Sequence, residues 1–315
     1  MTKKTNKLIS LIIPIYNETK GIDLLFNKLC EVIDLLKEDF EFICVNDASS
    51  DDSLGKLKNL RKKDKRIKII DFSRNFGKEA AMTAAIDLAK GDAVIPIDAD
   101  LQDPPELIKE MIEKWHEGYK VVLATRKSRS SEGKIKEFTA RLFYKLIGKI
   151  SKVPIPPNTG DFRLMDRKVV DVIKQLPERT RFMKGIFAWA GFETTQVYFD
   201  RPGRSTGNTS WNYWKLWQFA LDGIASFSTM PLKIWTYVGS LISLFAIIYS
   251  VYLIIRTIIF GADVPGYASI MTAVLFLGGI QLIGIGVLGE YIARIYKETK
   301  QRPIYIIKEK IGFGK

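Results

Sequence analysis

The sequence predicts an α/β protein in which a mostly parallel sheet domain is followed by interfacial helices and two transmembrane helices. Five short apolar runs alternate with helical patterns between residues 8 and 125, as is typical of βαβ crossovers in a sheet covered on both faces. Segments 234–260 and 268–292 are almost entirely apolar and exceed the roughly 20 residues that span a bilayer core. A buried helical hairpin is the alternative, but such helices are usually shorter.

The elements follow in order along the chain. The predicted strands are the short apolar runs 8–15, 40–45, 67–72, 93–97 and 121–125. The predicted helices lie between them, at 22–37, 53–62, 77–89 and 105–117. Segment 159–166 is expected to form a turn that leads into a helix with Asp166 as its N-cap.

Polar residues follow each predicted strand, at 17–18, 46–47, 74–75, 98–102 and 126. Ligands of parallel sheets bind beyond the carboxyl ends of the strands, so we expect these side chains to share one site. Asp98 and Asp100 are the most informative pair, because two carboxylates beside a sheet suit a divalent cation that bridges to phosphate oxygens. The pair alone could also be a solvated turn or a helix cap.

The charge of the chain favours a membrane rather than a nucleic acid. The formal net charge is +13, yet no nucleic-acid motif accompanies it. Attraction to anionic lipid headgroups or to a phosphorylated lipid is therefore expected. Most of the basic residues between 126 and 152 are expected to lie on a solvated surface that faces the membrane.

The membrane segment predicts both an orientation and a division of the chain. Lysines and arginines flank the two apolar segments on their outer sides, whereas the connecting loop 261–266 has none, which predicts that both termini are cytoplasmic. Aromatic residues at 211–217 predict helices at the headgroup level. The expected parts are a sheet domain (1–205), juxtamembrane interfacial helices (206–232), two transmembrane helices (233–297) and a cytoplasmic tail (298–315). Glycines in the second span permit close helix packing, and a homo-oligomer would be compatible with them.

Five motifs occur in a recognisable order: PIYNE at 14–18, VNDASSDDS at 45–53, RNFGKE at 74–79, DADLQDPP at 98–105 and GDFR at 160–163. Together they resemble the family 2 inverting glycosyltransferases. They resemble more closely the polyprenyl-phosphate glycosyltransferases, which include dolichol-phosphate mannose synthases and GtrB-type bactoprenol glucosyltransferases. The resemblance covers essentially the whole chain and implies a GT-A (Rossmann-like) fold on a multi-pass protein of the bacterial inner (plasma) membrane, with the catalytic domain cytoplasmic.

The resemblance also implies roles for individual residues. Asp98, Asp100 and Gln102 would hold Mg²⁺ or Mn²⁺ against the diphosphate of a nucleotide sugar. Asp103 replaces a histidine that the family often has, and would add a carboxylate near the metal or cap the helix opened by Pro104; we favour the cap. The residues expected to bind the donor are Pro14, Tyr16, Asn17, Glu18, Asp47, Lys78, Asp98 and Ala99. For Lys78, an ordinary surface position remains an equal alternative.

The expected catalytic residues are Asp161 and Asp100. The nucleophile is a phosphate oxygen of undecaprenyl phosphate, which is largely ionised near pH 7 because the second pKa of a phosphate monoester is about 6. Asp161 is therefore expected to position a substrate and to stabilise positive charge rather than to remove a proton. Since two anions must meet, arginines are expected at the acceptor phosphate. The candidates are Arg126, Arg141, Arg163 and Arg201.

The reaction that the resemblance implies is an inverting transfer of a sugar, with UDP-glucose the expected donor, to undecaprenyl phosphate at the cytoplasmic membrane face. The alternatives are the same acceptor with another sugar, namely an aminoarabinose derivative, an N-acetylhexosamine or mannose from GDP-mannose. A catalytically silent membrane scaffold is a further alternative, which the intact set of aspartates disfavours.

Overall fold

The computed structural model describes residues 6–127, 159–176, 178–200, 230–261 and 266–314. Within these residues, eight strands form one sheet in the order β7-β5-β6-β4-β1-β2-β3-β8. The strands are β1 (Leu8–Ile15), β2 (Asp39–Asn46), β3 (Ile67–Phe72), β4 (Ala93–Pro96), β5 (Val121–Arg126), β6 (Thr159–Asp166), β7 (Thr194–Phe199) and β8 (Ile307–Ile311). All five predicted strands are present, and their ends differ from the predictions by at most one residue.

The sheet is mostly parallel, as predicted. β1 pairs in parallel with both β2 and β4, β2 pairs with β3, and β5 pairs with β7. Two strands run against this direction: β6 lies antiparallel between β4 and β5, and β8 is antiparallel to β3. The carboxyl ends of β1 to β4 consequently meet at one edge of the sheet.

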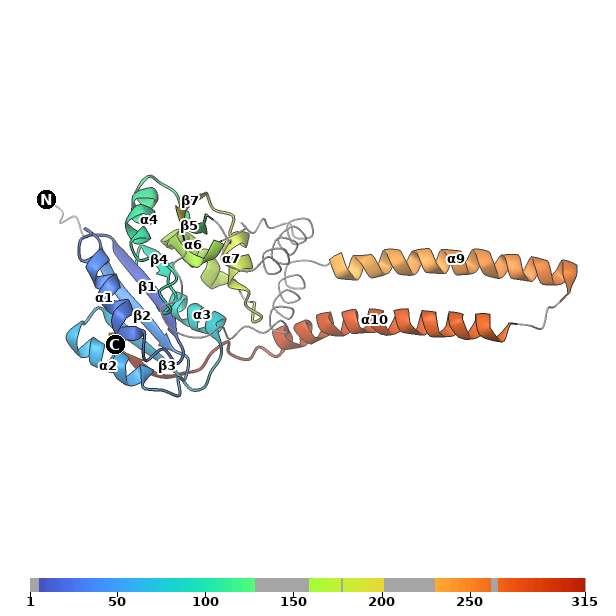
Figure 1. Cartoon of the computed structure of the whole chain (residues 1–315), viewed down its shortest axis with the longest axis horizontal. Coiled ribbons are helices and arrows are strands. Elements are labelled where there is room, and N and C mark those ends of the chain that lie inside the picture. The colour runs from blue at the N-terminus through green and yellow to red at the C-terminus, as the bar shows by residue number, and fades with distance from the viewer. Residues whose placement is uncertain (1–5, 128–158, 177, 201–229, 262–265, 315) are drawn as a thin grey trace.

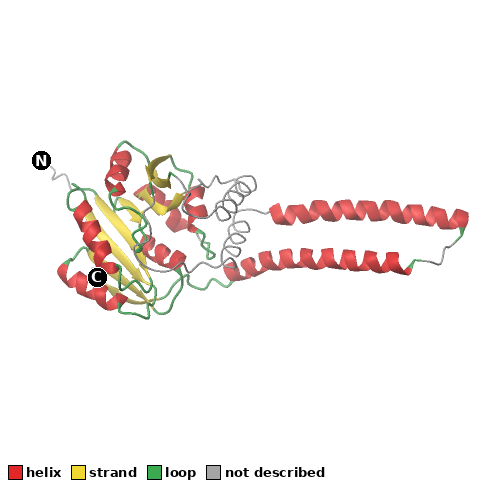
Figure 2. Ribbon diagram, viewed as in Figure 1, coloured by secondary structure: helices red, strands yellow, loops and turns green. Residues whose placement is uncertain are grey.

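Helices cover both faces of the sheet (Figure 2). The helices of the sheet domain are α1 (Ile22–Ile33), α2 (Ser53–Lys63), α3 (Lys78–Leu88), α4 (Leu107–His116), α6 (Arg167–Gln175) and α7 (Met183–Trp189). Ile9, Leu11 and Ile13 of β1 belong to a core that α1, α2 and α4 cover, whereas Ile12 belongs to a core beneath α3, α6 and α7. Because successive strand side chains point to opposite faces, one apolar strand supplies both cores.

Segment 159–166 corrects one prediction. It was expected to be a turn but is strand β6, inserted between β4 and β5. Its glycine and polar residues indicate a turn locally, but Phe162 and Leu164 are buried in the core, so tertiary pairing overrides local propensity. The predicted N-cap is confirmed, because the Asp166 side chain accepts a hydrogen bond from the Lys168 amide at 3.0 Å.

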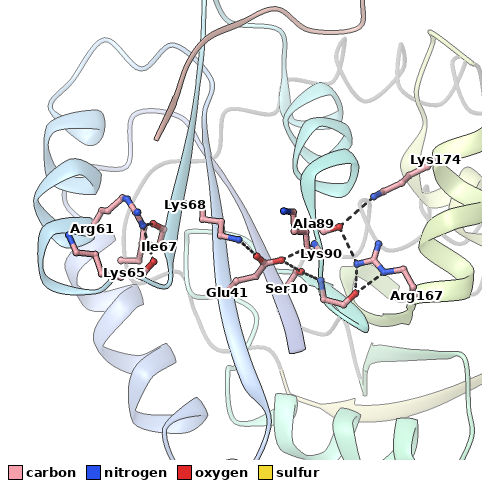
Figure 3. A network of polar contacts seen from close by, with 11 residues as sticks. Ser10, Glu41, Arg61, Lys65, Ile67, Lys68, Ala89, Lys90, Arg167 and Lys174 are labelled. Carbon is pink, nitrogen blue, oxygen red and sulfur yellow. Dashed lines mark hydrogen bonds and ion pairs between the residues drawn. The ribbon is translucent and has the colours of Figure 1, made fainter. Parts of the chain in front are cut away.

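A polar network ties together the amino ends of the central strands, away from the carboxyl edge (Figure 3). The buried Glu41 carboxylate accepts hydrogen bonds from the Ser10 hydroxyl, the Lys68 ammonium and the Lys90 amide. Nearby, Arg167 of α6 donates to the carbonyls of residues 89 and 91, which follow α3. Buried polar groups need such partners, so this network holds α3 and α6 in fixed positions on the sheet.

Two long helices follow the sheet domain: α9 (Met230–Phe260) and α10 (Tyr267–Thr299). They lie side by side and extend away from the sheet (Figure 1), and a Cβ added at Gly284 of α10 would lie 3.7 Å from the Trp235 ring of α9. Both are long and apolar enough to cross a membrane, and their large apolar side chains are exposed, as the sequence predicts. Of the segment predicted to form interfacial helices (206–232), residues 206–229 lie outside the described part of the chain. Residues 230–232 belong to the start of α9.

The end of the chain returns to the sheet domain. β8 adds an antiparallel edge strand beside β3, and the ring of Tyr305 stacks on Phe72 with the centroids 5.4 Å apart. The Tyr305 hydroxyl donates to Asp87 at 2.8 Å. Strands β7 and β8 were not among the predicted strands. Residues 304–313 fasten the chain that leaves α10 to the side of the sheet.

Candidate active site

The first two motifs interlock beyond the carboxyl ends of β1 and β2. The Asn17 side-chain oxygen accepts a hydrogen bond from the Ser50 amide at 2.8 Å, and Asn17 has a φ of +56°. The Glu18 amide donates to the Ser53 hydroxyl at 3.0 Å. These contacts hold the loop at 16–18 and the loop at 48–53 together as one surface (the shelf). About half of the Tyr16 side chain on this surface is accessible to solvent.

Asp47 organises the next loop. Its two carboxylate oxygens accept hydrogen bonds from the amides of Phe76, at 2.7 Å, and Gly77, at 2.8 Å. Gly77 has a φ of +92°, a region that glycine adopts far more readily than other residues. Asp47 therefore fixes the start of α3, the helix that carries Lys78. The predicted contact between Asp47 and a nucleotide sugar stays a prediction. Pro14, another predicted donor residue, lies half-buried within β1.

Lys78 connects two predicted site residues that are far apart in the sequence. Its Nζ lies 2.6 Å from Oδ1 of Asp98 and 2.8 Å from Oδ2 of Asp161. Asp98 follows β4 and Asp161 lies in β6, so the lysine joins the two strands at the site. Lys78 therefore pairs with two carboxylates of the candidate site, and its contact with the diphosphate of a donor stays a prediction.

The pKa values follow from this bridge. Burial alone would lower the pKa of Lys78, but the charges of Asp98 and Asp161 outweigh it and raise that pKa. Burial opposes ionisation of Asp161, but the charges of Lys78, Lys184 and Arg163 outweigh it and lower the pKa of Asp161 to about 2. Near pH 7 the site therefore holds the ionised Asp161 carboxylate beside the Lys78 ammonium.

The predicted metal ligands lie on a tight turn after β4. The Asp100 carboxylate accepts a hydrogen bond from the Gln102 amide at 3.2 Å, and Leu101 between them has a φ of +57°. Ala99 is buried beneath the turn. The Gln102 side-chain oxygen is buried without a hydrogen-bond donor among the described residues, which costs on the order of 1–3 kcal/mol unless a ligand satisfies it.

This donor set fits a hard divalent cation. Two carboxylates and an amide oxygen are ligands that Mg²⁺ and Mn²⁺ accept. Within the described part of the chain, no three His, Cys, Asp or Glu side chains gather as a metal site by themselves. The buried oxygen of Gln102, together with phosphate oxygens of a substrate, would therefore have to complete the coordination.

The expected capping role of Asp103 is wrong. Helix α4 begins at Leu107, and its N-cap residue is Glu106. Pro104 and Pro105 form a turn before the helix, so Asp103 lies too far upstream to cap it. Asp103 is buried instead, one position after Gln102, the last of the predicted metal ligands.

Glu79 lies close to the Asp161 carboxylate, although it was not among the predicted site residues. Its Oε2 accepts a hydrogen bond from the Met183 amide of α7 at 3.1 Å. Burial and the charge of Asp161 raise the pKa of Glu79 to about 7. Its place after Lys78 in the third motif was the available signal, but the contact with α7 depends on residues about a hundred positions away.

The four predicted acceptor arginines differ in position. Arg163 is buried, donates to the carbonyl of Gly160 at 2.7 Å, and stacks over the Phe187 ring at 4.5 Å from its centroid. These contacts hold the first residues of β6, which include Asp161. Arg126 lies half-buried at the end of β5. The other two candidates, Arg141 and Arg201, lie outside the described residues.

The mostly parallel sheet, with aspartates beyond the carboxyl ends of its strands, defines a GT-A glycosyltransferase domain. The two apolar helices α9 and α10 follow this domain in the chain. The chain belongs to glycosyl transferase family 2, whose model matches residues 10–174. A second model, the GtrB C-terminal hairpin, matches residues 230–295. Both matches agree with the resemblance carried by the five motifs.

Relatives cover nearly the full length of the chain. It is 60% identical to an uncharacterized glycosyltransferase of Synechocystis sp., over 96% of each chain. It is 51% identical to a prophage bactoprenol glucosyl transferase homolog of Escherichia coli, over 95% of this chain and 98% of that protein. Mannosyl-3-phosphoglycerate synthase from Rubrobacter xylanophilus has a similar fold, with a TM-score of 0.51, 16% identity, and coverage of 74% of this chain and 75% of that one.

Proposed function

We propose that this protein transfers glucose from UDP-glucose to undecaprenyl phosphate at the cytoplasmic face of the bacterial inner membrane, with inversion at the anomeric carbon. The observation that carries the proposal is the Lys78 bridge between Asp98 and Asp161. It brings the proposed metal-binding side and the proposed catalytic carboxylate of a GT-A site within reach of one bound sugar. Relatives named as bactoprenol glucosyl transferases support the acceptor and the sugar.

The proposed roles follow from the charges of the site. Asp161 has a pKa of about 2, so it is ionised at neutral pH and would stabilise positive charge that develops at the anomeric carbon. It need not act as a base, because the acceptor phosphate is already largely ionised. The exposed Tyr16 and the shelf around Asn17 would receive the nucleoside.

Asp98, Asp100 and Gln102 would hold Mg²⁺ or Mn²⁺. When bound, the cation would neutralise the charge that develops on the departing diphosphate. Lys78 binds the carboxylates of both Asp98 and Asp161 and would offset the negative charge that they bring together. Arg163 would orient Asp161 within β6 through its hydrogen bond to Gly160, and we propose that role for it in place of direct phosphate binding.

The membrane helices provide the proposed access to the acceptor. A polyprenyl chain remains in the bilayer, so its phosphate can only meet a site held close to the membrane surface. Helices α9 and α10 are long enough to cross the bilayer. They would hold the sheet domain at that surface.

The test is label transfer from a panel of UDP- and GDP-sugars to undecaprenyl phosphate, using the purified full-length protein with Mg²⁺, with Mn²⁺ and with a chelator. The proposal expects transfer from UDP-glucose that the chelator abolishes and that Asp161→Asn strongly reduces. Transfer from another donor would correct the sugar and keep the acceptor. An absence of transfer from every donor would refute the proposal.

A further inference from the structure

We propose that Glu298, at the carboxyl end of α10, is a positioning residue that links the membrane hairpin to the active site. This inference rests on the proposed function. The Glu298 carboxylate binds the start of residues 179–182 (the Arg179 segment), which lead into α7. Helix α7 in turn contacts residues close to Asp161. The position of a membrane helix would thereby determine the alignment of the catalytic carboxylate.

The first contact joins α10 to the sheet domain. Oε1 of Glu298 accepts hydrogen bonds from the amide of Arg179 at 2.9 Å and from the amide of Thr180 at 3.1 Å, while Oε2 lies 3.1 Å from the Arg179 amide. The Arg179 side chain donates to the carbonyl of Arg302 in the chain that follows α10. Hydrogen bonds to an ionised carboxylate are about twice as strong as neutral ones.

The second contact joins the same segment to the site. Three residues after Thr180, the amide of Met183 donates to Glu79 at 3.1 Å. Glu79 directly follows Lys78, which binds Asp161. Lys184, the next residue of α7, lowers the pKa of Asp161 through its charge. Six residues, 179–184, therefore connect the end of α10 to the catalytic carboxylate.

The length of α10 allows this contact to report on the membrane. Its 33 residues extend roughly 50 Å at about 1.5 Å per residue, whereas the bilayer core is about 30 Å thick. The last turns of α10 therefore emerge from the bilayer, and Glu298 reaches the sheet domain there. A change in the depth or tilt of α10 would move the Arg179 segment with it.

A simple tether does not require Glu298. Strand β8 already pairs with β3, and Tyr305 already binds Phe72 and Asp87. The tail would remain attached without the Glu298 contact. The carboxylate instead binds a segment that leads directly into α7 beside the site, which favours a positioning role.

The test compares Glu298→Ala with a control in the full-length protein. The control is Glu309→Ala, which removes an exposed ion pair between β8 and Lys58 at 2.8 Å and leaves the Arg179 segment untouched. Glu298→Ala should lower kcat about tenfold, as expected for losing hydrogen bonds to a charged group. The KM for the nucleotide sugar should stay within about twofold, because the nucleoside is proposed to bind at other loops, those that contain Asn17 and Ser50. The control should resemble the wild type.

Amide hydrogen exchange provides a readout that does not need activity. Glu298→Ala should speed exchange at residues 179, 180 and 183, and Glu298→Gln, which retains one acceptor oxygen, should restore part of both kcat and protection. Unchanged exchange at Met183, or an equal loss of kcat in the control, would overturn the proposal. If the wild type transfers no sugar, that result rejects the proposed function alone. Faster exchange at Met183 in Glu298→Ala would still support the link between α10 and the site.

Discussion

Replacing Lys78 with methionine removes the cation between Asp98 and Asp161 while keeping a side chain of similar length. Two unit charges 2.8 Å apart interact by about 3 to 6 kcal/mol at an effective dielectric constant between about 40 and 20. At about 1.4 kcal/mol for each tenfold change, this corresponds to a roughly 100- to 10,000-fold increase in the proton affinity of Asp161. Because the Lys78 side chain is 41% exposed, solvent screening favours the lower end of that range.

The direction with pH follows from the lowered pKa of Asp161. In the wild type this pKa is about 2, so Asp161 stays ionised throughout the assay range and does not limit activity. In Lys78→Met the pKa of Asp161 rises, so a fraction of the enzyme becomes protonated and inactive as the pH falls. A 100-fold increase in proton affinity raises the pKa of Asp161 by about two units. The ratio of mutant to wild-type kcat/KM, measured from about pH 8 to about pH 4, should therefore be flat above about pH 6 and decrease towards pH 4.

The assay is label transfer to undecaprenyl phosphate over that pH range. Taking the ratio to the wild type cancels the titration of the acceptor phosphate, which both enzymes share. Lys78→Arg is the matched control, because it keeps the positive charge and should show a flat ratio. A flat ratio for Lys78→Met, at near wild-type activity, would refute the electrostatic role of Lys78.

Three further predictions concern the proposed metal-binding turn at 98–102 and the polar network around Glu41. Gln102→Ala removes the buried amide oxygen and should raise the Mn²⁺ concentration for half-maximal transfer about tenfold; an unchanged requirement would exclude Gln102 as a ligand. Gly91→Ala would place a Cβ 2.6 Å from the amide nitrogen of Ser10, so the free energy of unfolding should fall by about 1–3 kcal/mol, measured by urea denaturation; an unchanged value would contradict this packing. Glu41 has a lowered folded pKa, because its hydrogen bonds to Lys68, Ser10 and Lys90 outweigh the opposing effect of burial. The stability that Glu41 contributes is present above the unfolded pKa of about 4.5 and is lost as the pH falls through the folded pKa. Glu41→Gln should accordingly be less stable than the wild type at pH 7, with the difference shrinking in acid, whereas a constant difference in thermal midpoint would argue against an ionised Glu41.

Much of the sheet domain was predictable because its signals are local. The apolar runs at 8–15 and 67–72 have the length and composition of buried strands, and both are strands with the predicted ends. The long apolar segments were equally plain, since their length is set by the bilayer. Asp166 was recognised as a helix N-cap from its immediate neighbours, and the structure confirms it.

Where pairing is long-range, the local signals fail. The GDFR segment reads as a turn, yet it is strand β6, because β4 and β5 provide antiparallel partners on both sides. Strand β8 is polar at its centre and forms only because β3 offers an open edge more than two hundred residues earlier. Neither partner is visible in a window of neighbouring residues.

The sequence by itself determined the class of fold, the two apolar helices and the set of aspartates that marks the site, because composition, period and motif order encode these directly. Only the tertiary structure decided that Lys78 joins Asp98 to Asp161, that Glu79 contacts α7, and that Glu298 reaches the Arg179 segment. Each of these contacts joins residues from different strands or helices. Their strength depends on distance, burial and neighbouring charge, which exist only after the chain has folded.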